Sequence, residues 1–353
     1  MTVLKLGSLF DGIGVFPLAA MHCGMEPVWA SEIEARPISI TKRHFPDMLH
    51  LGDITKISGA EIPPVDVITF GSPCQDLSQI GTRNGFAGKK SSLFYQAMRI
   101  IEEMRYATNG RYPAFTVWEN VAGAFSSNDR LDFAAMLSAF TGAEVSVPPR
   151  GWAHAGMVRG GCADTAWRLL DAQYWGEPAL VQRRKRVFVV ADFAGQRAGE
   201  VLFKPRTVLP FSAIGGPGGL SATQRGGVPA AQTGRQVPIV RPFSLRRMRT
   251  MAQVGDQKGF CASFGRGGEP FPTLLASVTA PFSFWYEGEE RDGFLRVLTP
   301  LECERLMGLP ENWTKYGCKN EEISDHARYR ALGNSIALPC AEYVMAGIAE
   351  VMN

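Results

Sequence analysis

The residues whose chemistry stands out are a cysteine and a glutamate that each follow an apolar segment. Cys74 comes directly after Pro73 in "VDVITFGSPCQDLS" (65–78), where an apolar, β-branched run stops at a glycine. Glu119 lies in "FTVWENV" (115–121), a second segment of the same kind. If the two segments are neighbouring parallel strands, their carboxyl ends bring the thiol and the carboxylate to one edge of a sheet. Proline restrains the backbone ahead of the cysteine, and N–H groups of the following loop can lower the thiol pKa.

The pairing of this cysteine with a glutamate rather than a histidine limits the reactions that it can catalyse. A nucleophilic cysteine usually has a histidine as its base, and no histidine is well placed here, so cysteine protease chemistry fits poorly. A cysteine with a glutamate suits attack on a heteroaromatic ring whose nitrogen must be protonated. The seven cysteines form no CxxC pair, and the five histidines do not cluster with them. We therefore expect neither a disulfide framework nor a metal site.

A glycine turn and two acidic residues indicate a nucleoside-like ligand. Phe10, Gly12 and Gly14 form F-x-G-x-G in "LFDGIG", between a predicted strand and a predicted helix. Glu32 ends the next strand, about 20 residues on, where a carboxylate can bind ribose hydroxyls. Asp53 in "GDIT" can accept from an adenine amino group. A plain tight turn and surface carboxylates are the alternative, and no phosphate-binding lysine motif accompanies the turn.

These residues need a parallel α/β sheet to position them. Strand patterns at 3–10, 26–32, 65–70, 115–121 and 186–193 alternate with helical patterns, which predicts a mostly parallel sheet with helices on both faces. Hydrophobic residues make up 45% and charged residues 20%, as in a globular protein. No apolar run reaches the roughly 18 residues of a membrane span, and the N-terminus lacks a signal-peptide cleavage site. We expect a cytoplasmic protein with no membrane contact.

The pattern changes after residue 193. The stretch 205–240 is rich in glycine and proline, and short β-like pieces follow at 262–282, which predicts a smaller irregular domain. Residues 197–266 hold eleven Lys or Arg and two Asp or Glu, a footprint for a polyanion or a solvated basic surface. Helical signals return at 298–310, with Thr299, Pro300 and Glu302 as a capped start and Gly308 as a stop. A last helix is predicted from 335 to 351.

Taken in order, "FDGIG", "SEIE", "GDIT", "GSPCQDLS", "WENV", "QRRKRVF", "LTPLECERLMGLPENW" and "ALGNSIALP" resemble the DNA (cytosine-5)-methyltransferase family, bacterial and phage type. The likeness covers 3–193 and 294–350. It implies a Rossmann-like, S-adenosyl-L-methionine-dependent catalytic domain at 1–193 and a β-rich target-recognition domain at 194–293. A hinge and packing region at 294–330 and a C-terminal helix at 331–353, returning to the catalytic domain, would follow.

The resemblance also implies roles for the catalytic residues. Cys74 would attack C6 of a cytosine, and Glu119 would protonate N3, so that C5 takes the methyl group from S-adenosyl-L-methionine. Arg184 and Arg186 in "QRRKR" would hold the base oxygen and help position the thiolate and Glu119; phosphate contact is the alternative for this basic run. The target base would be flipped out of double-stranded DNA. The segment 78–92 is predicted to be a mobile loop that closes on the DNA.

The remaining site residues follow from the family's motifs. The resemblance implies cofactor contacts by Phe10, Gly12, Ile13, Gly14, Glu32, Ile33, Asp53, Ile54, Pro73, Asn334 and Ser335. Ile33 stands where the family often has an aromatic residue on the adenine. The implied DNA contacts are Gln75, Ile80, Arg83, Arg246, Arg247, Arg266, Thr273 and Leu274.

The same residues argue against three other functions. A tRNA cytosine-5 methyltransferase would have a shorter recognition region than the basic stretch of about 100 residues here. A non-catalytic DNA-binding homologue is expected to lose the cysteine or the glutamate, and both are present. A methyltransferase acting on exocyclic amines would carry a different motif at this strand end. The expectation is a monomer that methylates double-stranded DNA in a bacterial cell or phage-infected host, with a separately acting restriction endonuclease left open.

Overall fold

The computed structural model describes residues 3–72, 93–204, 239–242, 271, 273–274, 282–286 and 293–353. Several of the predicted site residues lie outside these ranges, as does the predicted mobile loop at 78–92; they are Pro73, Cys74, Gln75, Ile80, Arg83, Arg246, Arg247 and Arg266. All other predicted site residues can be placed.

An eight-stranded sheet forms the centre of the molecule, in the order β3-β2-β1-β4-β5-β8-β7-β6. From β3 to β5 every pair is parallel, and from β5 to β6 every pair is antiparallel. The strands are β1 (Lys5–Leu9), β2 (Glu26–Ser31), β3 (Leu49–His50), β4 (Val67–Phe70), β5 (Phe115–Val121), β6 (Ala155–Arg159), β7 (Asp164–Asp171) and β8 (Lys185–Asp192). The predicted α/β class with a mostly parallel sheet is confirmed, and each predicted strand is present.

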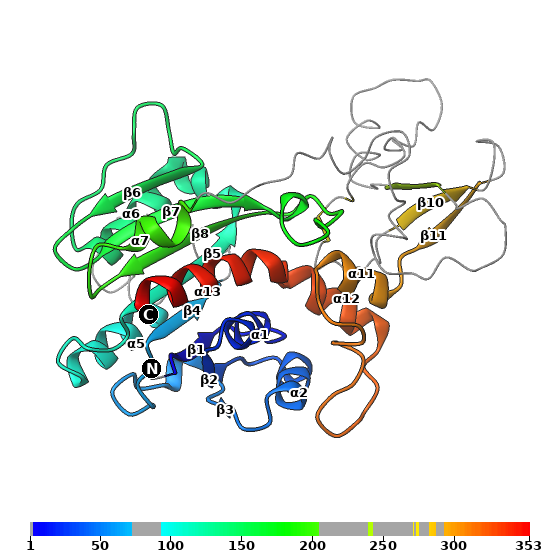
Figure 1. The fold of residues 1–353 in the computed structure, drawn as a ribbon, viewed down its shortest axis with the longest axis horizontal. Helices are drawn as coiled ribbons and strands as arrows, with labels where there is room; N and C mark the ends of the chain where they lie inside the picture. The colour runs from blue at the N-terminus through cyan, green and yellow to red at the C-terminus, as the bar shows by residue number, and fades with distance from the viewer. Residues whose placement is uncertain are drawn as a thin grey trace.

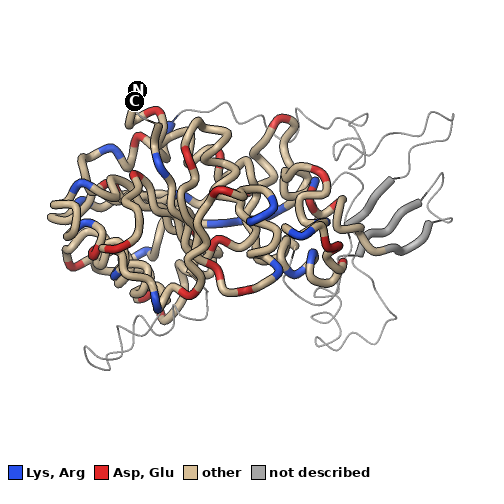
Figure 2. The backbone as a smooth tube through the Cα atoms, turned by 90° about the horizontal axis from the view of Figure 1, so that it is seen from below, with Lys and Arg blue, Asp and Glu red and all other residues tan. Residues whose placement is uncertain are grey.

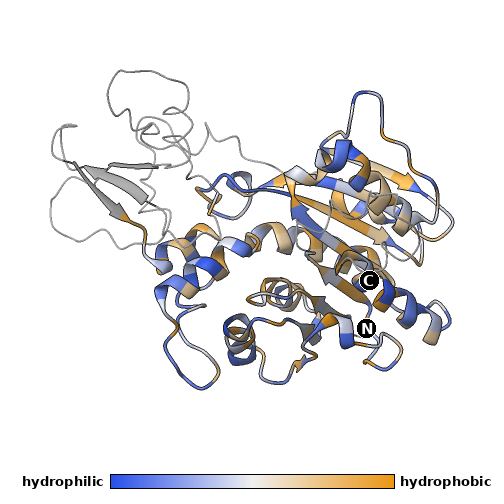
Figure 3. Ribbon diagram, turned by 180° about the vertical axis from the view of Figure 1, so that it is seen from behind, coloured by the Kyte–Doolittle hydropathy of each residue, from blue (hydrophilic) through white to orange (hydrophobic). Residues whose placement is uncertain are grey.

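Helices cover both faces of this sheet (Figure 1). One apolar core includes α1 (Val15–His22), α7 (Ala198–Leu202) and α13 (Leu338–Met352), and a second includes α5 (Leu93–Ala107) and α6 (Leu131–Thr141). The strands of the parallel half are buried on both sides, so they are apolar runs without alternation. The hydropathy colours follow this layering, with orange concentrated on the central strands and on the helix faces toward them (Figure 3). Short 3₁₀ turns lie at Ile54–Lys56, Ala122–Phe125, Ser127–Arg130 and Ala172–Tyr174.

A second, three-stranded antiparallel sheet lies apart from the first. It consists of β9 (Ile239–Pro242), β10 (Phe282–Tyr286) and β11 (Gly293–Val297), in the order β11-β10-β9. β9 and β10 lie within the predicted recognition region at 194–293, whereas β11 begins at its last residue and continues to Val297. The division of the chain into domains stays a prediction, because most of that region lies outside the described residues.

The C-terminal part folds back onto the first core. The helix α11 (Pro300–Leu306) starts with the predicted capping box at Thr299, and Gly308 follows it at a φ of 72°. The helices α2 (Ala35–His44) and α12 (Asp325–Asn334) lie near the Gly turn and the sequence "GNS". The last helix begins at Leu338, three residues later than predicted, because the backbone at Ser335 and Ala337 is extended.

The last helix, α13, lies against the N-terminal helix α1. It packs on α1 and α7, and Arg168 on β7 donates a hydrogen bond to the Tyr343 hydroxyl oxygen at 2.9 Å. In the described part of the chain no single helix is long and apolar enough to cross a membrane; α12 and α13 meet that test only as a pair bent by 43°. Basic and acidic residues are interspersed over the described backbone (Figure 2), in keeping with the net charge of +3.

Candidate active site

A buried ion pair lies where β5 and β8 meet. The antiparallel register pairs Glu119 with Phe188 and Val121 with Arg186, so Glu119 and Arg186 are diagonal neighbours on one face. Arg186 Nε lies 2.9 Å from Glu119 Oε1, and the two side chains are 13% and 12% exposed. Burial raises the pKa of Glu119, while the positive charges of Arg186 and Arg184 oppose the rise. The carboxyl group of Glu119 therefore keeps its proton to a higher pH than an exposed glutamate does, as a proton donor must.

The same strand holds the chain immediately ahead of the cysteine. Trp118 Nε1 donates to Ser72 Oγ at 3.0 Å, and Asn120 Nδ2 donates to the Ser72 carbonyl oxygen at 3.0 Å. A Cβ atom on Gly71 would lie 3.1 Å from a Glu119 carboxylate oxygen, so the strand end passes close to the acid. Cys74 follows Ser72 by two residues in the sequence. The roles of Ser72 and Asn120 were missed by sequence reasoning, although "ENV" gave the signal.

Arg184 has a different environment from Arg186. It is 1% exposed, and its guanidinium donates to the carbonyl oxygens of Leu274 (2.9 Å), Gly333 (2.8 Å) and Ser335. Burial, together with the neighbouring Arg186, lowers the pKa of this guanidinium well below its usual value. Arg184 thus connects a segment of the predicted recognition region with the segment that carries Ser335.

The segment around Thr273 is bonded into the catalytic body. Phe271 exchanges backbone hydrogen bonds with Val181 and Arg183, and Thr273 Oγ1 donates to the Arg183 carbonyl oxygen at 2.6 Å. The Leu274 side chain is 5% exposed and belongs to the core that includes α13. Of the two predicted DNA contacts at this point, only Thr273 has a side chain near the surface.

The Gly turn and Glu32 are joined by a hydrogen bond. Gly12 and Gly14 have φ angles of 59° and 78°, and Phe10 has 55°. The glycines adopt this left-handed region without steric cost. Glu32 Oε2 accepts from Gly12 N at 2.9 Å, while Oε1 accepts from Ile33 N at 2.7 Å. The carboxylate is held at the carboxyl edge of the sheet, and carboxylate oxygens have further lone pairs for ribose hydroxyls.

The adenine side of the predicted pocket is also at this edge. Asp53 is partly exposed, and its pKa is lowered by hydrogen bonds from Thr55 N and Oγ1. Ile33 is 72% exposed, whereas Ile54 is 4% exposed. An exposed apolar side chain beside the Glu32 carboxylate fits the flat face and polar edges of an adenosine. These residues therefore suit the nucleoside part of S-adenosyl-L-methionine.

The "GNS" end approaches the same edge through α12. Arg330 Nη2 lies 2.7 Å from Glu34 Oε1, and Glu34 N donates to Glu32 Oε1 at 2.9 Å. Asn334 ends α12 and is exposed, and Ser335 follows it. The structure thus links α12, which ends at Asn334, to Glu32 by one ion pair and one hydrogen bond.

One titratable group of the turn was missed from the sequence. The carboxyl group of Asp11 is buried, and burial raises its pKa to about 7, helped by the negative charge of Glu32. Thr41 Oγ1 donates to Asp11 Oδ2 at 3.3 Å. Asp11 is the acidic residue of "FDGIG", a motif whose glycines, rather than its carboxyl group, indicated a ligand.

Comparisons with known proteins agree with this arrangement. A family described as C-5 cytosine-specific DNA methylase matches residues 4–204 and 246–350. Type II methyltransferase M1.ScrFI of Lactococcus lactis subsp. cremoris is 27% identical over 357 residues, or 99% of this chain and 78% of that protein. DNA N-6-adenine-methyltransferase of Escherichia phage P1 is 24% identical over 463 residues, and the match spans 98% of this chain but 61% of that protein. The solved Entamoeba histolytica methyltransferase EhMeth has a TM-score of 0.61 at 14% identity, covering 100% of both chains.

The sheet with its Gly turn and acidic strand ends is that of an S-adenosyl-L-methionine-dependent methyltransferase. With the family match over most of its length, the chain belongs to the C-5 cytosine-specific DNA methylases, enzymes that methylate cytosine in DNA. S-adenosyl-L-methionine is its cofactor.

Proposed function

We propose that the protein methylates C5 of a cytosine flipped out of a specific double-stranded DNA sequence, through a covalent adduct between Cys74 and C6. The observation that supports it is the buried Glu119, which has a raised pKa, an arginine partner at 2.9 Å and neighbours on its own strand that hold Ser72. A protonated acid near the cysteine is what activation of a pyrimidine ring requires.

The reaction balances with these residues. The Cys74 thiolate forms a bond to C6 while Glu119 gives its proton to N3, so the ring electrons gather at C5. S-adenosyl-L-methionine supplies the electrophilic methyl group. Once C5 is methylated, it loses its proton to a base, the bond between sulfur and C6 breaks, and N3 returns its proton to Glu119. The thiolate is regenerated, and the methylated base is released.

Arg184 and Arg186 have different supporting roles. Arg186 keeps Glu119 in place and contacts the base oxygen, because its guanidinium lies beside the acid at the sheet edge. Arg184 positions the segments on either side of it through backbone carbonyl oxygens. This differs from direct contact with the base, since the Arg184 side chain is almost fully buried.

The cofactor is held by the residues that gather at the carboxyl edge. Glu32 binds the ribose hydroxyls, Asp53 accepts from the adenine amino group, and Ile33 packs on the adenine. Phe10, Ile13 and the glycines of the turn line the methionine end together with Asn334 and Ser335. Residues 194–293 read the target sequence.

The covalent step is tested with Cys74→Ser, using Cys162→Ser as a control because Cys162 is an exposed free thiol. The Cys74 variant is expected to bind S-adenosylhomocysteine normally and to lose methyl transfer; the control is expected to keep both. DNA with 5-fluorocytosine is expected to trap a covalent complex with the wild-type protein, because fluorine at C5 cannot leave as a proton. Full turnover by the Cys74 variant would refute the mechanism.

The modified base is identified by mass spectrometry of nucleosides from cells that express the protein, together with bisulfite sequencing. 5-Methylcytosine in DNA at one short sequence is the expected result. N6-methyladenine in DNA, or 5-methylcytosine confined to tRNA, would contradict the proposal. We further propose a monomer that acts in the cytoplasm of a bacterial or phage-infected cell, alone or beside a separate restriction endonuclease.

A further inference from the structure

We infer that Trp313 is a positioning residue of the cofactor site, which it supports by holding the peptide between Ile13 and Gly14; the inference rests on the proposed role of the Gly turn. Trp313 Nε1 donates to the Ile13 carbonyl oxygen at 2.8 Å, although the two residues are 300 positions apart. Trp313 is 5% exposed and Ile13 is 1% exposed, so water does not replace this bond.

The peptide that Trp313 holds has few local constraints of its own. Gly12 and Gly14 flank Ile13, both at positive φ, and glycine allows several backbone conformations at equal cost. The nitrogen of the same peptide, Gly14 N, donates to the Asp11 carbonyl oxygen at 3.2 Å. One bond therefore fixes each side of the peptide plane, and the bond from Trp313 is the one supplied by a distant part of the chain.

Trp313 is itself fixed from α2. The His44 ring stacks on the indole with ring centroids 3.6 Å apart and planes 5° apart, and His44 Nε2 hydrogen-bonds to the Trp313 carbonyl oxygen at 2.8 Å. Phe45 meets the indole edge-on, with ring centroids 6.0 Å apart. The indole can therefore act as a rigid support for the turn.

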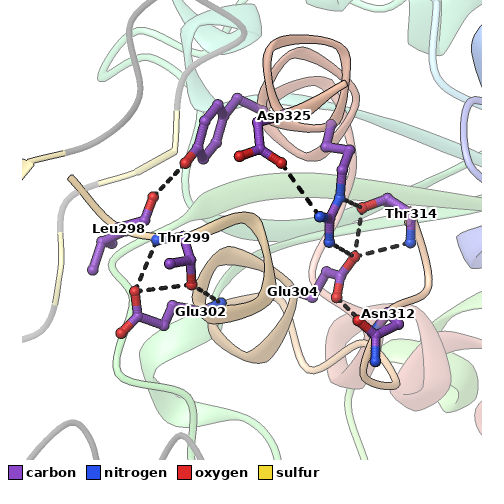
Figure 4. A network of polar contacts seen from close by, with 9 residues as sticks. Leu298, Thr299, Glu302, Glu304, Asn312, Thr314 and Asp325 are labelled. Carbon is purple, nitrogen blue, oxygen red and sulfur yellow. Dashed lines mark hydrogen bonds and ion pairs between the residues drawn. The ribbon is translucent and has the colours of Figure 1, made fainter. Parts of the chain in front are cut away.

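The residues on either side of Trp313 are anchored by a buried carboxylate. Glu304 Oε2 accepts from Asn312 N at 2.8 Å, and Glu304 Oε1 accepts from Thr314 N at 2.9 Å and from Arg328 Nη2 at 3.0 Å (Figure 4). Glu304 is fully buried and Arg328 is 6% exposed. The polar network thus extends from α11 and α12 through Trp313 to the Gly turn.

The test replaces one N–H donor and keeps most of the ring. Trp313→Phe removes the bond to Ile13 and leaves a buried carbonyl oxygen unpaired. Trp167→Phe is the matched control: Trp167 is 6% exposed, and its Nε1 donates to the Ala153 carbonyl oxygen at 3.0 Å, in the antiparallel half of the sheet. Both variants of the full chain are compared with the wild type by thermal unfolding and by calorimetric binding of S-adenosylhomocysteine.

We expect Trp313→Phe to weaken S-adenosylhomocysteine binding about tenfold, the effect of losing one buried hydrogen bond. The KM for S-adenosyl-L-methionine should rise by a similar factor, with kcat at saturating cofactor within about twofold of the wild type. Both Trp313→Phe and Trp167→Phe should lower the melting temperature, by similar amounts. Trp167→Phe should leave the affinity for S-adenosylhomocysteine unchanged. His44→Phe, which keeps the stack and loses the hydrogen bond, should weaken binding in the same direction and serves if Trp313→Phe does not fold.

Unchanged affinity in Trp313→Phe, or equal weakening in Trp167→Phe, would overturn the inference. The proposed function is judged separately by Glu32→Gln and by the wild type. If the wild type does not bind S-adenosylhomocysteine, the proposed cofactor site fails; if Glu32→Gln weakens binding and Trp313→Phe does not, only the inference fails.

Discussion

Replacing Glu304 with glutamine tests whether the C-terminal network stabilises the fold. The carboxylate of Glu304 is fully buried and faces donors on every side: Asn312 N, Thr314 N, Thr314 Oγ1 and Arg328 Nη2. Glutamine has nearly the same shape, but it has one acceptor oxygen and one donor group, and no charge. The substitution therefore changes the chemistry of the site with little change in its volume.

The structure sets the size of the effect. Whichever way the glutamine amide is oriented, its NH₂ group faces at least one backbone N–H, which costs about 1–3 kcal/mol for a buried unpaired donor. Arg328 also loses its buried counter-charge, and breaking such a pair typically costs about 3–5 kcal/mol. Arg328 keeps a bond to Thr314 Oγ1 at 3.0 Å and a longer contact of 3.5 Å to Asp325, which offsets part of the loss. We expect Glu304→Gln to lower the free energy of unfolding by about 3–5 kcal/mol, a large share of the roughly 5–15 kcal/mol of a typical domain.

Urea unfolding followed by tryptophan fluorescence measures this loss as a lower midpoint at an unchanged slope. Glu302→Gln is the control on the same helix, because Glu302 is only partly buried and its capping bonds to Thr299 can be kept by an amide oxygen. The control is expected to lose less than about 1 kcal/mol. A loss below about 1 kcal/mol for Glu304→Gln would refute the reasoning, since the buried pair would then contribute no more than an exposed one.

Three further outcomes are expected. Asp11 binds its proton more tightly in the folded state, with a pKa of about 7 against 3.8, so the free energy of unfolding of the wild type should fall by up to about 4 kcal/mol as pH rises from about 4 to 7. Asp11→Asn should remove this pH dependence, which unfolding curves at pH 4.5 and 8 measure. Arg186→Met removes a charge that lowers the pKa of Glu119, so the alkaline limb of the kcat profile should move to higher pH at reduced kcat; an unmoved limb would exclude Glu119 as the acid. Asn120→Ala frees the Ser72 carbonyl oxygen and should lower kcat at least tenfold while S-adenosylhomocysteine affinity, measured by calorimetry, stays within twofold.

The sequence predicted β1, β2, β4, β5 and β8 because each is a short apolar run bounded by turn residues. "FTVWENV" became β5 with the predicted bounds, and the strand ending at Phe70 leads into the Pro-Cys pair. The capping box at Thr299 was also predictable, since its bonds join residues three positions apart. Such features depend on neighbours in the chain, so one sequence contains the information.

The antiparallel half of the sheet was harder to predict. β6 and β7 were not identified, and the direction of β8 was not recognised, because strand direction depends on pairing between distant segments rather than on local pattern. The consequence for the site is large. Only the antiparallel register of β5 with β8 makes Glu119 and Arg186 diagonal neighbours.

The sequence by itself determined the family, through the order of its motifs, and it singled out the residues proposed to carry chemistry: the cysteine behind a proline, the acidic strand ends and the Gly turn. Tertiary structure alone decided why residues of the same type have different environments. Arg184 and Arg186 are two positions apart on one segment. Arg184 is buried and donates to three carbonyl oxygens, whereas Arg186 pairs with Glu119. Trp313 and Ile13 are joined by a hydrogen bond across the chain. Burial and long-range pairing arise only when distant segments pack together, and they set the charge, the pKa and the freedom of each group.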